Sequence, residues 1–194
     1  MTIQTVSALA DLLMLLSAAG LVALLVSIAV QLVRRRWRSA AVLGGAAGAL
    51  AVVYGSVLVG AGLVSGTREL RPGDTKCFDD WCASMVAARP DAAGDLLVDV
   101  RVENRGRGRP MRANLARAYV EVPGGGQVAP LDASGLRTLL QPGEHTDVPL
   151  TFRVPSPVRG SRFVVTEGAG QLGPGTFEIG GEGSPFHGIA GWPV

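Results

Sequence analysis

The stretch from Leu12 to Val33 reads LLMLLSAAGLVALLVSIAVQLV and carries no charged side chain over its 22 residues. A helix needs roughly 20 apolar residues to cross the hydrocarbon core of a bilayer, so this stretch predicts a transmembrane helix. A basic cluster, RRRWR at Arg34–Arg38, comes next. A second uncharged run of 27 residues follows at Ser39–Ser65 and is rich in Ala, Val, Leu and Gly. Two spans separated by five residues predict a helical hairpin in a membrane.

The basic cluster between the spans predicts which way the hairpin faces. Short loops rich in arginine stay on the cytoplasmic side, so Arg34, Arg35, Arg36 and Arg38 are expected there. No Lys or Arg precedes the first span, and that span is longer than the apolar core of a signal peptide, so we expect a retained helix. The expected divisions are an extracytoplasmic N-terminus (1–11), a first span (12–33), a cytoplasmic turn (34–38), a second span (39–65) and an extracytoplasmic domain (66–194).

The charged residues are distributed unevenly along the chain. Residues 1–66 hold four of the 18 basic and one of the 16 acidic residues, which leaves 14 basic and 15 acidic residues for positions 67–194. The outer domain therefore lacks the basic surplus that nucleic-acid binding uses. Neither span contains an ionisable side chain, and Asp11 lies only at the outer edge of the first. Ion and proton pathways normally need such groups, so a monomeric transporter is disfavoured.

Small residues recur along the second span at the spacing of close helix contacts. Gly44 and Gly48 form a GxxxG motif, which lets two helices approach closely in lipid. A parallel row of small side chains beside it consists of Ala41, Gly45 and Ala49. We expect this face to pack against the other helix of the hairpin. The alternative is a contact between copies of the chain, giving a homo-oligomer.

The outer domain alternates apolar and polar side chains in short runs separated by Gly and Pro. In Leu96–Glu103, for example, three valines alternate with charged residues, as in a half-buried strand. The expected strands are Leu96–Glu103, Ala116–Val122, Thr146–Val154, Arg162–Glu167 and Thr176–Ile179. Pro149 cannot donate to a sheet ladder, so it indicates an edge strand. The pattern predicts an antiparallel β-sandwich.

Particular residues at the strand ends also resemble a known group of domains. Asn104 and Gly106 end one strand, Pro142-Gly143-Glu144 forms a turn into another, and Val154-Pro155 closes it. With CFDDWC at 77–82 and SPFHG at 184–188, residues 72–190 are similar to the small immunoglobulin-like (telokin-like) domains of bacterial exported and membrane-anchored proteins. The resemblance implies the fold and the membrane-anchored topology. It implies no reaction.

The two cysteines, Cys77 and Cys82, are expected outside the cytoplasm, where an even number favours a disulfide. If Asp79 and Asp80 form a two-residue turn, the cysteines become opposite residues of a hairpin. Their Cα atoms would then lie roughly 4.5 Å apart, within reach of a disulfide. An alternative is a copper or zinc site formed by the two cysteines and His187, with one of the aspartates. A redox-active thiol pair is a third possibility, although the spacing is not C-x-x-C.

The sequence favours a function in interaction rather than in catalysis. We predict a non-enzymatic accessory module in a bacterial inner or plasma membrane, displaying the β-sandwich outside and binding a membrane or extracytoplasmic protein. This prediction includes no cofactor, no catalytic residue and no nucleic acid. The alternative function is that of a metal-binding or thiol-redox protein using Cys77, Cys82 and His187.

Overall fold

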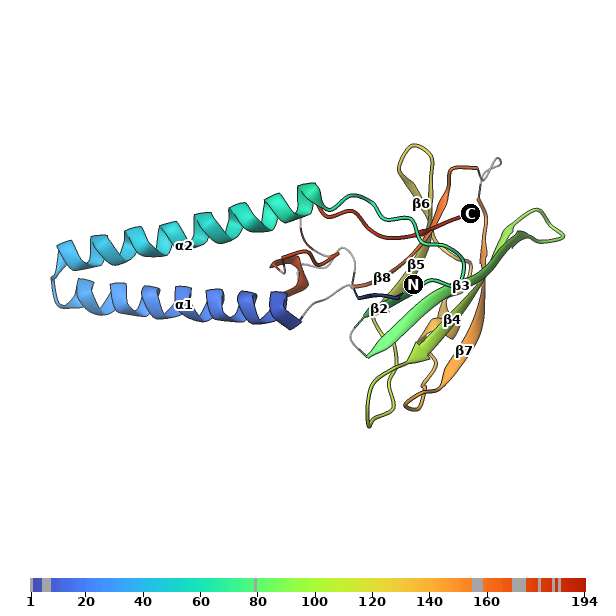
Figure 1. The fold of residues 1–194 in the computed structure, drawn as a ribbon, viewed down its shortest axis with the longest axis horizontal. Coiled ribbons are helices and arrows are strands. Elements are labelled where there is room, and N and C mark those ends of the chain that lie inside the picture. Colours follow the sequence, from blue (N-terminus) through green and yellow to red (C-terminus); the bar gives the residue numbers. More distant parts are fainter. Residues whose placement is uncertain are drawn as a thin grey trace. The chain divides into compact units, whose positions relative to one another are not determined.

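The computed structural model describes residues 2–4, 8–78, 80–154, 159–168, 174–177, 179–182, 184 and 186–194. The chain divides into two compact units, one helical and one made of β-strands (Figure 1). The helical unit comprises Val6–Gly66 and Leu172–His187, and the β unit comprises Met1–Thr5, Thr67–Gln171 and Gly188–Val194. Met1–Thr5 thus belongs to the β unit although it comes before the helices in sequence. Leu172–His187 belongs to the helical unit although segments of the β unit flank it in sequence.

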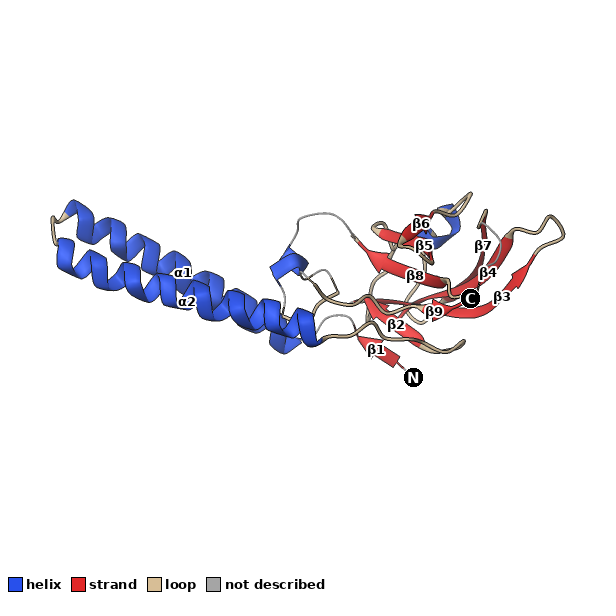
Figure 2. Cartoon of the chain, turned by 90° about the horizontal axis from the view of Figure 1, so that it is seen from above, coloured by secondary structure: helices blue, strands red, loops and turns tan. Residues whose placement is uncertain are grey.

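Helices α1 (Ala8–Val33) and α2 (Trp37–Val64) form a hairpin. They lie side by side in both views (Figures 1 and 2). The turn between them is shorter than the expected 34–38, because Trp37 and Arg38 already lie in α2. Arg35 has a φ of 56°, the left-handed conformation by which the turn reverses the chain. Helix α1 also begins four residues before the expected Leu12.

The two helices meet along a narrow seam. A Cβ atom built on Gly20 of α1 would lie 3.7 Å from Leu50 Cδ2 of α2. The buried residues of α2 are Ala40, Ala47, Leu58 and Gly62. Few side chains of the helices are buried. In the most apolar stretch of each helix, none of the residues of α1 and 11% of those of α2 are buried. Both helices are long and apolar enough to cross a membrane.

The described part of the β unit contains two sheets, one with strand order β1-β2-β3-β4-β7 and the other with order β6-β5-β8-β9. The strands are β1 (Thr2–Gln4), β2 (Thr75–Phe78), β3 (Trp81–Pro90), β4 (Leu96–Asn104), β5 (Ala116–Val122), β6 (Gly126–Val128), β7 (His145–Phe152), β8 (Arg162–Glu167) and β9 (Trp192–Pro193). Paired strands are antiparallel except for β1 and β2, which run parallel. The expected strands at 96–103, 116–122, 146–154 and 162–167 are confirmed to within two residues. As Pro149 indicated, β7 lies at a sheet edge.

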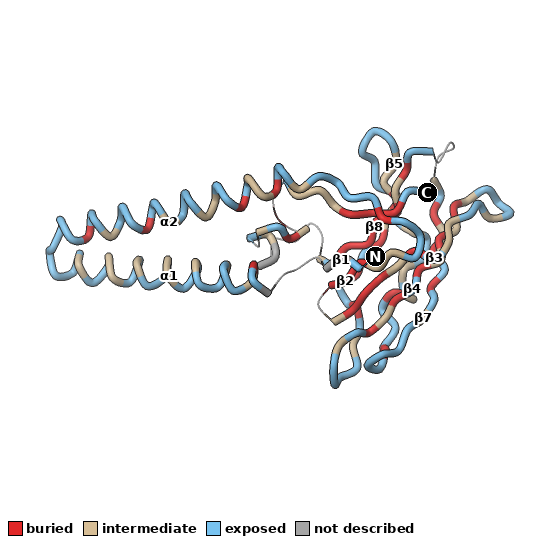
Figure 3. The backbone as a smooth tube through the Cα atoms, in the orientation of Figure 1, coloured by how far each residue is buried: buried red, intermediate tan, exposed pale blue. Residues whose placement is uncertain are grey.

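One apolar core lies between the two sheets. Figure 3 shows the buried residues concentrated in the β unit. Val98, Val100 and Val102 of β4 are at most 1% exposed, so the predicted inward face is confirmed. Phe152 of β7 and Phe163 of β8 meet edge to face, with ring centroids 5.9 Å apart. This aromatic contact joins the two sheets directly.

Several parts of the fold differ from the sequence prediction, and strands β3, β6 and β9 are among them. The expected strand at Thr176–Ile179 is wrong, because Pro174–Phe177 forms a short 3-10 helix, η2, within the helical unit. Strand β1 was not expected: Thr2, Ile3 and Gln4 pair in register with Thr75, Lys76 and Cys77 of β2. The β unit therefore takes one strand from before the helical hairpin and the remaining strands from after it.

Candidate functional site

The two cysteines lie at the end of a hairpin formed by β2 and β3. Cys77 and Cys82 are directly opposite each other, as the sequence predicted, and they form a disulfide with Cα atoms 4.0 Å apart. Phe78 pairs with Trp81 at the next position, also as predicted. Asp79, the first residue of the expected turn, lies outside the described residues.

The inner side of this disulfide hairpin is closed by two aromatic rings. Phe78 and Trp81 stack with ring centroids 4.5 Å apart, and each is less than 5% exposed. Trp81 Nε1 donates a hydrogen bond of 3.1 Å to Glu167 Oε1 at the end of β8. Because β8 belongs to the other sheet, this bond ties the hairpin to both layers.

The loop that follows β4 holds the tip of the hairpin. The Asp80 carbonyl oxygen accepts hydrogen bonds from the backbone N–H groups of Arg105 at 2.7 Å and Gly106 at 3.0 Å. Arg105 Nη1 lies 4.0 Å from Cys77 Sγ, and Arg105 Nε donates to Glu103. The disulfide is thus packed beneath an ion pair, and Cys77 and Cys82 are only 6% and 1% exposed.

Asn104, which contributes to the resemblance described above, has a structural role in this loop. It is fully buried, and its Nδ2 donates to the carbonyl oxygens of Leu140 at 2.9 Å and Arg109 at 3.2 Å. Its Oδ1 accepts a hydrogen bond from Gly106 N. Both ends of the buried amide are therefore hydrogen-bonded, as burial of a polar group requires.

The residues of the alternative metal site do not form a visible cluster. Cys77 and Cys82 are bonded to each other, so neither supplies a free thiolate. His187 belongs to the helical unit, whereas the cysteines belong to the β unit. Within the described part of the chain, no three His, Cys, Asp or Glu side chains are grouped as metal ligands.

Removing the disulfide is expected to destabilise the β unit moderately. Replacing both Cys77 and Cys82 with serine should lower its free energy of unfolding by about 2 kcal/mol, because the closed loop is short. Urea unfolding of the full chain in detergent, followed by tryptophan fluorescence, measures this loss. Dithiothreitol should produce the same loss in the unmodified chain and no change in the serine variant. A serine variant as stable as its parent would show that the bond contributes nothing to folding.

Lys76 is an unusual residue that sequence reasoning missed. It is the single lysine of the chain, and it is fully buried on the inner face of β2. Its Nζ donates to the carbonyl oxygens of Val165 at 2.7 Å and Ala190 at 3.0 Å, and it lies 5.3 Å from the centroid of the Phe78 ring. The ammonium group therefore joins β2, β8 and the C-terminal segment. Lysine is rarely fully buried, so a solvated position is the default expectation from sequence.

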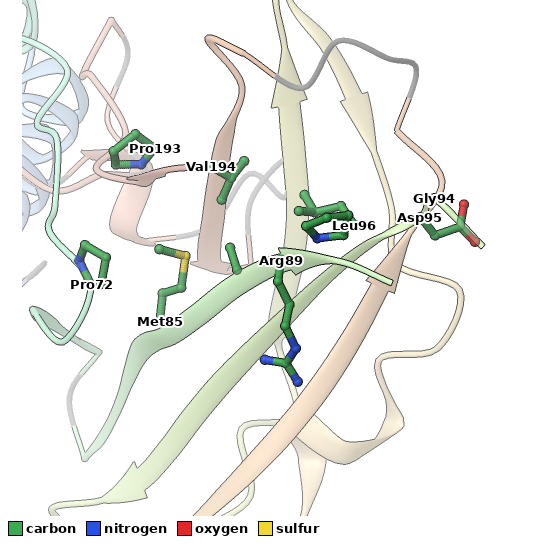
Figure 4. A pocket seen from close by; sticks show the side chains of 10 residues that line it. Pro72, Met85, Arg89, Gly94, Asp95, Leu96, Pro193 and Val194 are labelled. Carbon is green, nitrogen blue, oxygen red and sulfur yellow. The ribbon is translucent and has the colours of Figure 1, made fainter. Parts of the chain in front are cut away.

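A hollow of about 390 Å³ lies beside β3 in the β unit (Figure 4). Its lining residues are Pro72, Met85, Ala88, Arg89, Pro90, Gly94, Asp95, Leu96, Pro193 and Val194. The Arg89 side chain extends away from the hollow and forms an ion pair with Asp99, and the Asp95 carboxylate is 3.9 Å from Arg153. The volume lies in the range of small-ligand sites, which is about 300–1,000 Å³. The lining is mostly apolar, so the hollow suits an apolar group rather than acid–base chemistry.

The GxxxG motif of α2 and the row of small residues beside it do not face α1. Gly44, Gly45 and Gly48 are exposed, and a Cβ atom added to any of them would have no neighbour within 4 Å. Ala41 and Ala49 are exposed as well. The helix contact inside the hairpin is instead the seam described above. The expectation that this row packs against α1 is therefore wrong, because the spacing specifies close contact but not the partner helix.

Charges on the outer face of the larger sheet are neutralised within the sheet. Arg101 of β4 donates two hydrogen bonds, of 2.8 and 2.9 Å, to the carboxylate of Asp147 on β7. This bonding holds the pKa of Asp147 below its ordinary value and raises the pKa of Arg101. Glu103 pairs with Arg105 nearby. Paired charges of this kind suit a solvated surface and leave neither group poised for proton transfer at neutral pH.

Comparison with known proteins assigns no family to this arrangement. The chain matches no protein-family model, no curated protein and no solved structure.

Proposed function

We propose that this chain is a membrane-anchored interaction protein that acts by binding other proteins rather than by catalysis. The helical hairpin is the anchor, and the β unit is the part displayed outside the cytoplasm of a bacterial cell. The observation that carries the proposal is the apolar surface of the hairpin. Large side chains such as Leu16, Val52 and Val53 are more than 60% exposed, which is costly in water and favourable in lipid.

Strand β1 supports the placement of both ends on the same side. Residues Thr2–Gln4 share a sheet with β2, which supports a topology in which residues before and after the hairpin lie in the same compartment. Two membrane crossings connected by a short turn meet this requirement. The arginine-rich turn then lies on the opposite side, which the positive-inside rule assigns to the cytoplasm.

We further propose that the β unit is immunoglobulin-like. Its chain passes between the two sheets from β4 to β5, from β6 to β7 and from β7 to β8. Such crossings between antiparallel layers around one core are typical of immunoglobulin-like sandwiches. The buried Asn104 and the turn at Pro142-Gly143-Glu144 agree with the resemblance to telokin-like domains.

The interaction surface within the membrane is the small-residue row of α2. Because α1 does not cover this row, a second helix can approach its backbone closely, as at other GxxxG contacts. We propose that the second helix belongs to another copy of the chain. The hairpin would then associate laterally and bring two or more β units together.

Enlarging the row should weaken this association. Co-expressed copies carrying two different tags are expected to co-purify from membranes, and Gly48→Leu should reduce the co-purified fraction about tenfold, a cost of about 1.4 kcal/mol. Ala46→Leu is the matched control. Positions two residues apart differ by about 200° around the helix axis, so Ala46 points away from Gly48. Ala46 is also exposed, so its replacement should leave co-purification unchanged. Equal co-purification of both variants would exclude the row as the interface.

A further inference from the structure

Two phenylalanine rings outside the β unit are exposed. Phe177 and Phe186 are 57% and 70% exposed, whereas the phenylalanines of the core are at most 4% exposed. Both lie in the segment Pro174–His187, which groups with the helices. Trp192, which follows in the β unit, is by contrast fully buried. The two exposed rings would be stabilised by an apolar environment.

The register of the helical hairpin indicates where the outer boundary of the bilayer would lie. Gly20 lies against Leu50, so the positions of α1 and α2 that lie at the same level add up to 70. Asp11, the acidic residue in the first turn of α1, is therefore level with Val59 of α2. A carboxylate avoids the hydrocarbon core, so this level marks the outer boundary if the hairpin spans a membrane as proposed.

A tyrosine connects the segment to this boundary. Tyr54 is five residues from Val59, or about 7.5 Å deeper along the helix. Its hydroxyl group donates a hydrogen bond to the carbonyl oxygen of Phe177. The backbone at Phe177 is thus held close to Tyr54, just inside this boundary.

The backbone at Phe186 is also unusual. Its φ of 65° lies in the left-handed region, which is rare for a bulky residue and unfavourable in free energy. A strained residue that also exposes its ring to water would incur two costs. Contact of the ring with lipid removes the second. The segment 174–187 contains two glutamates, Glu178 and Glu182, and no Lys or Arg, so attraction to anionic lipids would not contribute to such contact.

We propose that the described residues at the two ends of this segment, Pro174–Phe177 and Phe186–His187, lie in the interfacial region of the outer leaflet, with the rings of Phe177 and Phe186 in contact with lipid. The inference rests on the proposed membrane-spanning hairpin and adds a third contact with the bilayer. The lipid surface thereby restrains the chain between the last core strands β8 and β9.

Spin labelling of the full chain in phosphatidylcholine nanodiscs tests this proposal. Labels at Phe177→Cys and Phe186→Cys are compared with a label at Leu131→Cys, whose parent residue is also 57% exposed but lies in the β unit. Val22→Cys, in the middle of α1, serves as the lipid control. Cys77 and Cys82 do not react, because they are bonded to each other. The measured quantity is the ratio of collision rates with oxygen and with a water-soluble nickel complex.

The ratio at positions 177 and 186 is expected to be at least threefold higher than at 131 and lower than at 22, and to be unchanged in 1 M NaCl. Ratios at 177 and 186 equal to that at 131, with a lipid-like ratio at 22, would overturn the interfacial segment and leave the anchor intact. A water-like ratio at 22 would overturn the anchor and with it this inference.

Discussion

Replacing Trp192 with alanine is expected to lower the free energy of unfolding of the β unit by about 3–5 kcal/mol. The indole is fully buried, and its ring centroid lies 5.7 Å from that of Phe163, which in turn contacts Phe152 of the other sheet. Alanine removes this packing and leaves a cavity that the two sheets cannot close. A small domain is stable by roughly 5–15 kcal/mol in total, so the variant should be close to unfolding.

The urea midpoint of the full chain in detergent, followed by near-ultraviolet circular dichroism, measures this effect. Trp192→Phe is the control, and it should cost about 1.5 kcal/mol or less. Trp192 Nε1 is buried without a hydrogen-bond partner among the described residues, so phenylalanine gives up no hydrogen bond there. An alanine variant with an unchanged midpoint would mean that β9 is not part of the folded core.

Replacing Lys76 with methionine is expected to cost about 2–4 kcal/mol, although the two side chains have similar volumes. The ammonium group donates to two buried carbonyl groups, those of Val165 and Ala190. Methionine fills the space and supplies no donor. Hydrogen bonds from charged donors are stronger than those between neutral groups. The substitution removes the Lys76 donor from both carbonyl oxygens.

The same urea titration tests this prediction, and Arg89→Met on the neighbouring strand is the control. Arg89 is exposed, and its ion pair with Asp99 lies on the outer face of the sheet, so its replacement should change stability by less than about 0.5 kcal/mol. If Lys76→Met proves as stable as the parent, burial of the ammonium group costs as much as its hydrogen bonds contribute.

The parts of the fold that could be predicted were those where a single physical pattern dominates. Uncharged length predicts the helices, and strict alternation predicts β4, β5 and β7. Strand β3 was missed because a bulge between Met85 and Ala87 shifts its register and breaks the alternation. Strand β1 is three residues long, too short for any period, and depends on pairing with a segment more than 70 residues away.

The candidate site could be predicted only in its local geometry. In a tight hairpin, the sequence spacing of two residues decides whether they lie opposite each other. The pairing of Cys77 with Cys82 could therefore be predicted from the sequence. The environment of the pair could not be predicted, because Arg105 reaches Cys77 from the loop after β4, and Glu167 of β8 bonds the neighbouring Trp81. Burial of Lys76 likewise depends on two carbonyl oxygens supplied by distant segments of the chain.

Strand β1 has a consequence for how the protein is made. Its partner, β2, is synthesised only after both helices, so the first residues of the chain must wait for the hairpin before the sheet can be completed. If the hairpin spans a membrane as proposed, a chain in which Thr2–Gln4 stayed on the cytoplasmic side could not supply β1, and the edge of β2 next to Cys77 would stay open. Under that proposal, completion of the sheet depends on insertion of both helices, and an incompletely inserted chain would expose an unpaired strand edge to other chains.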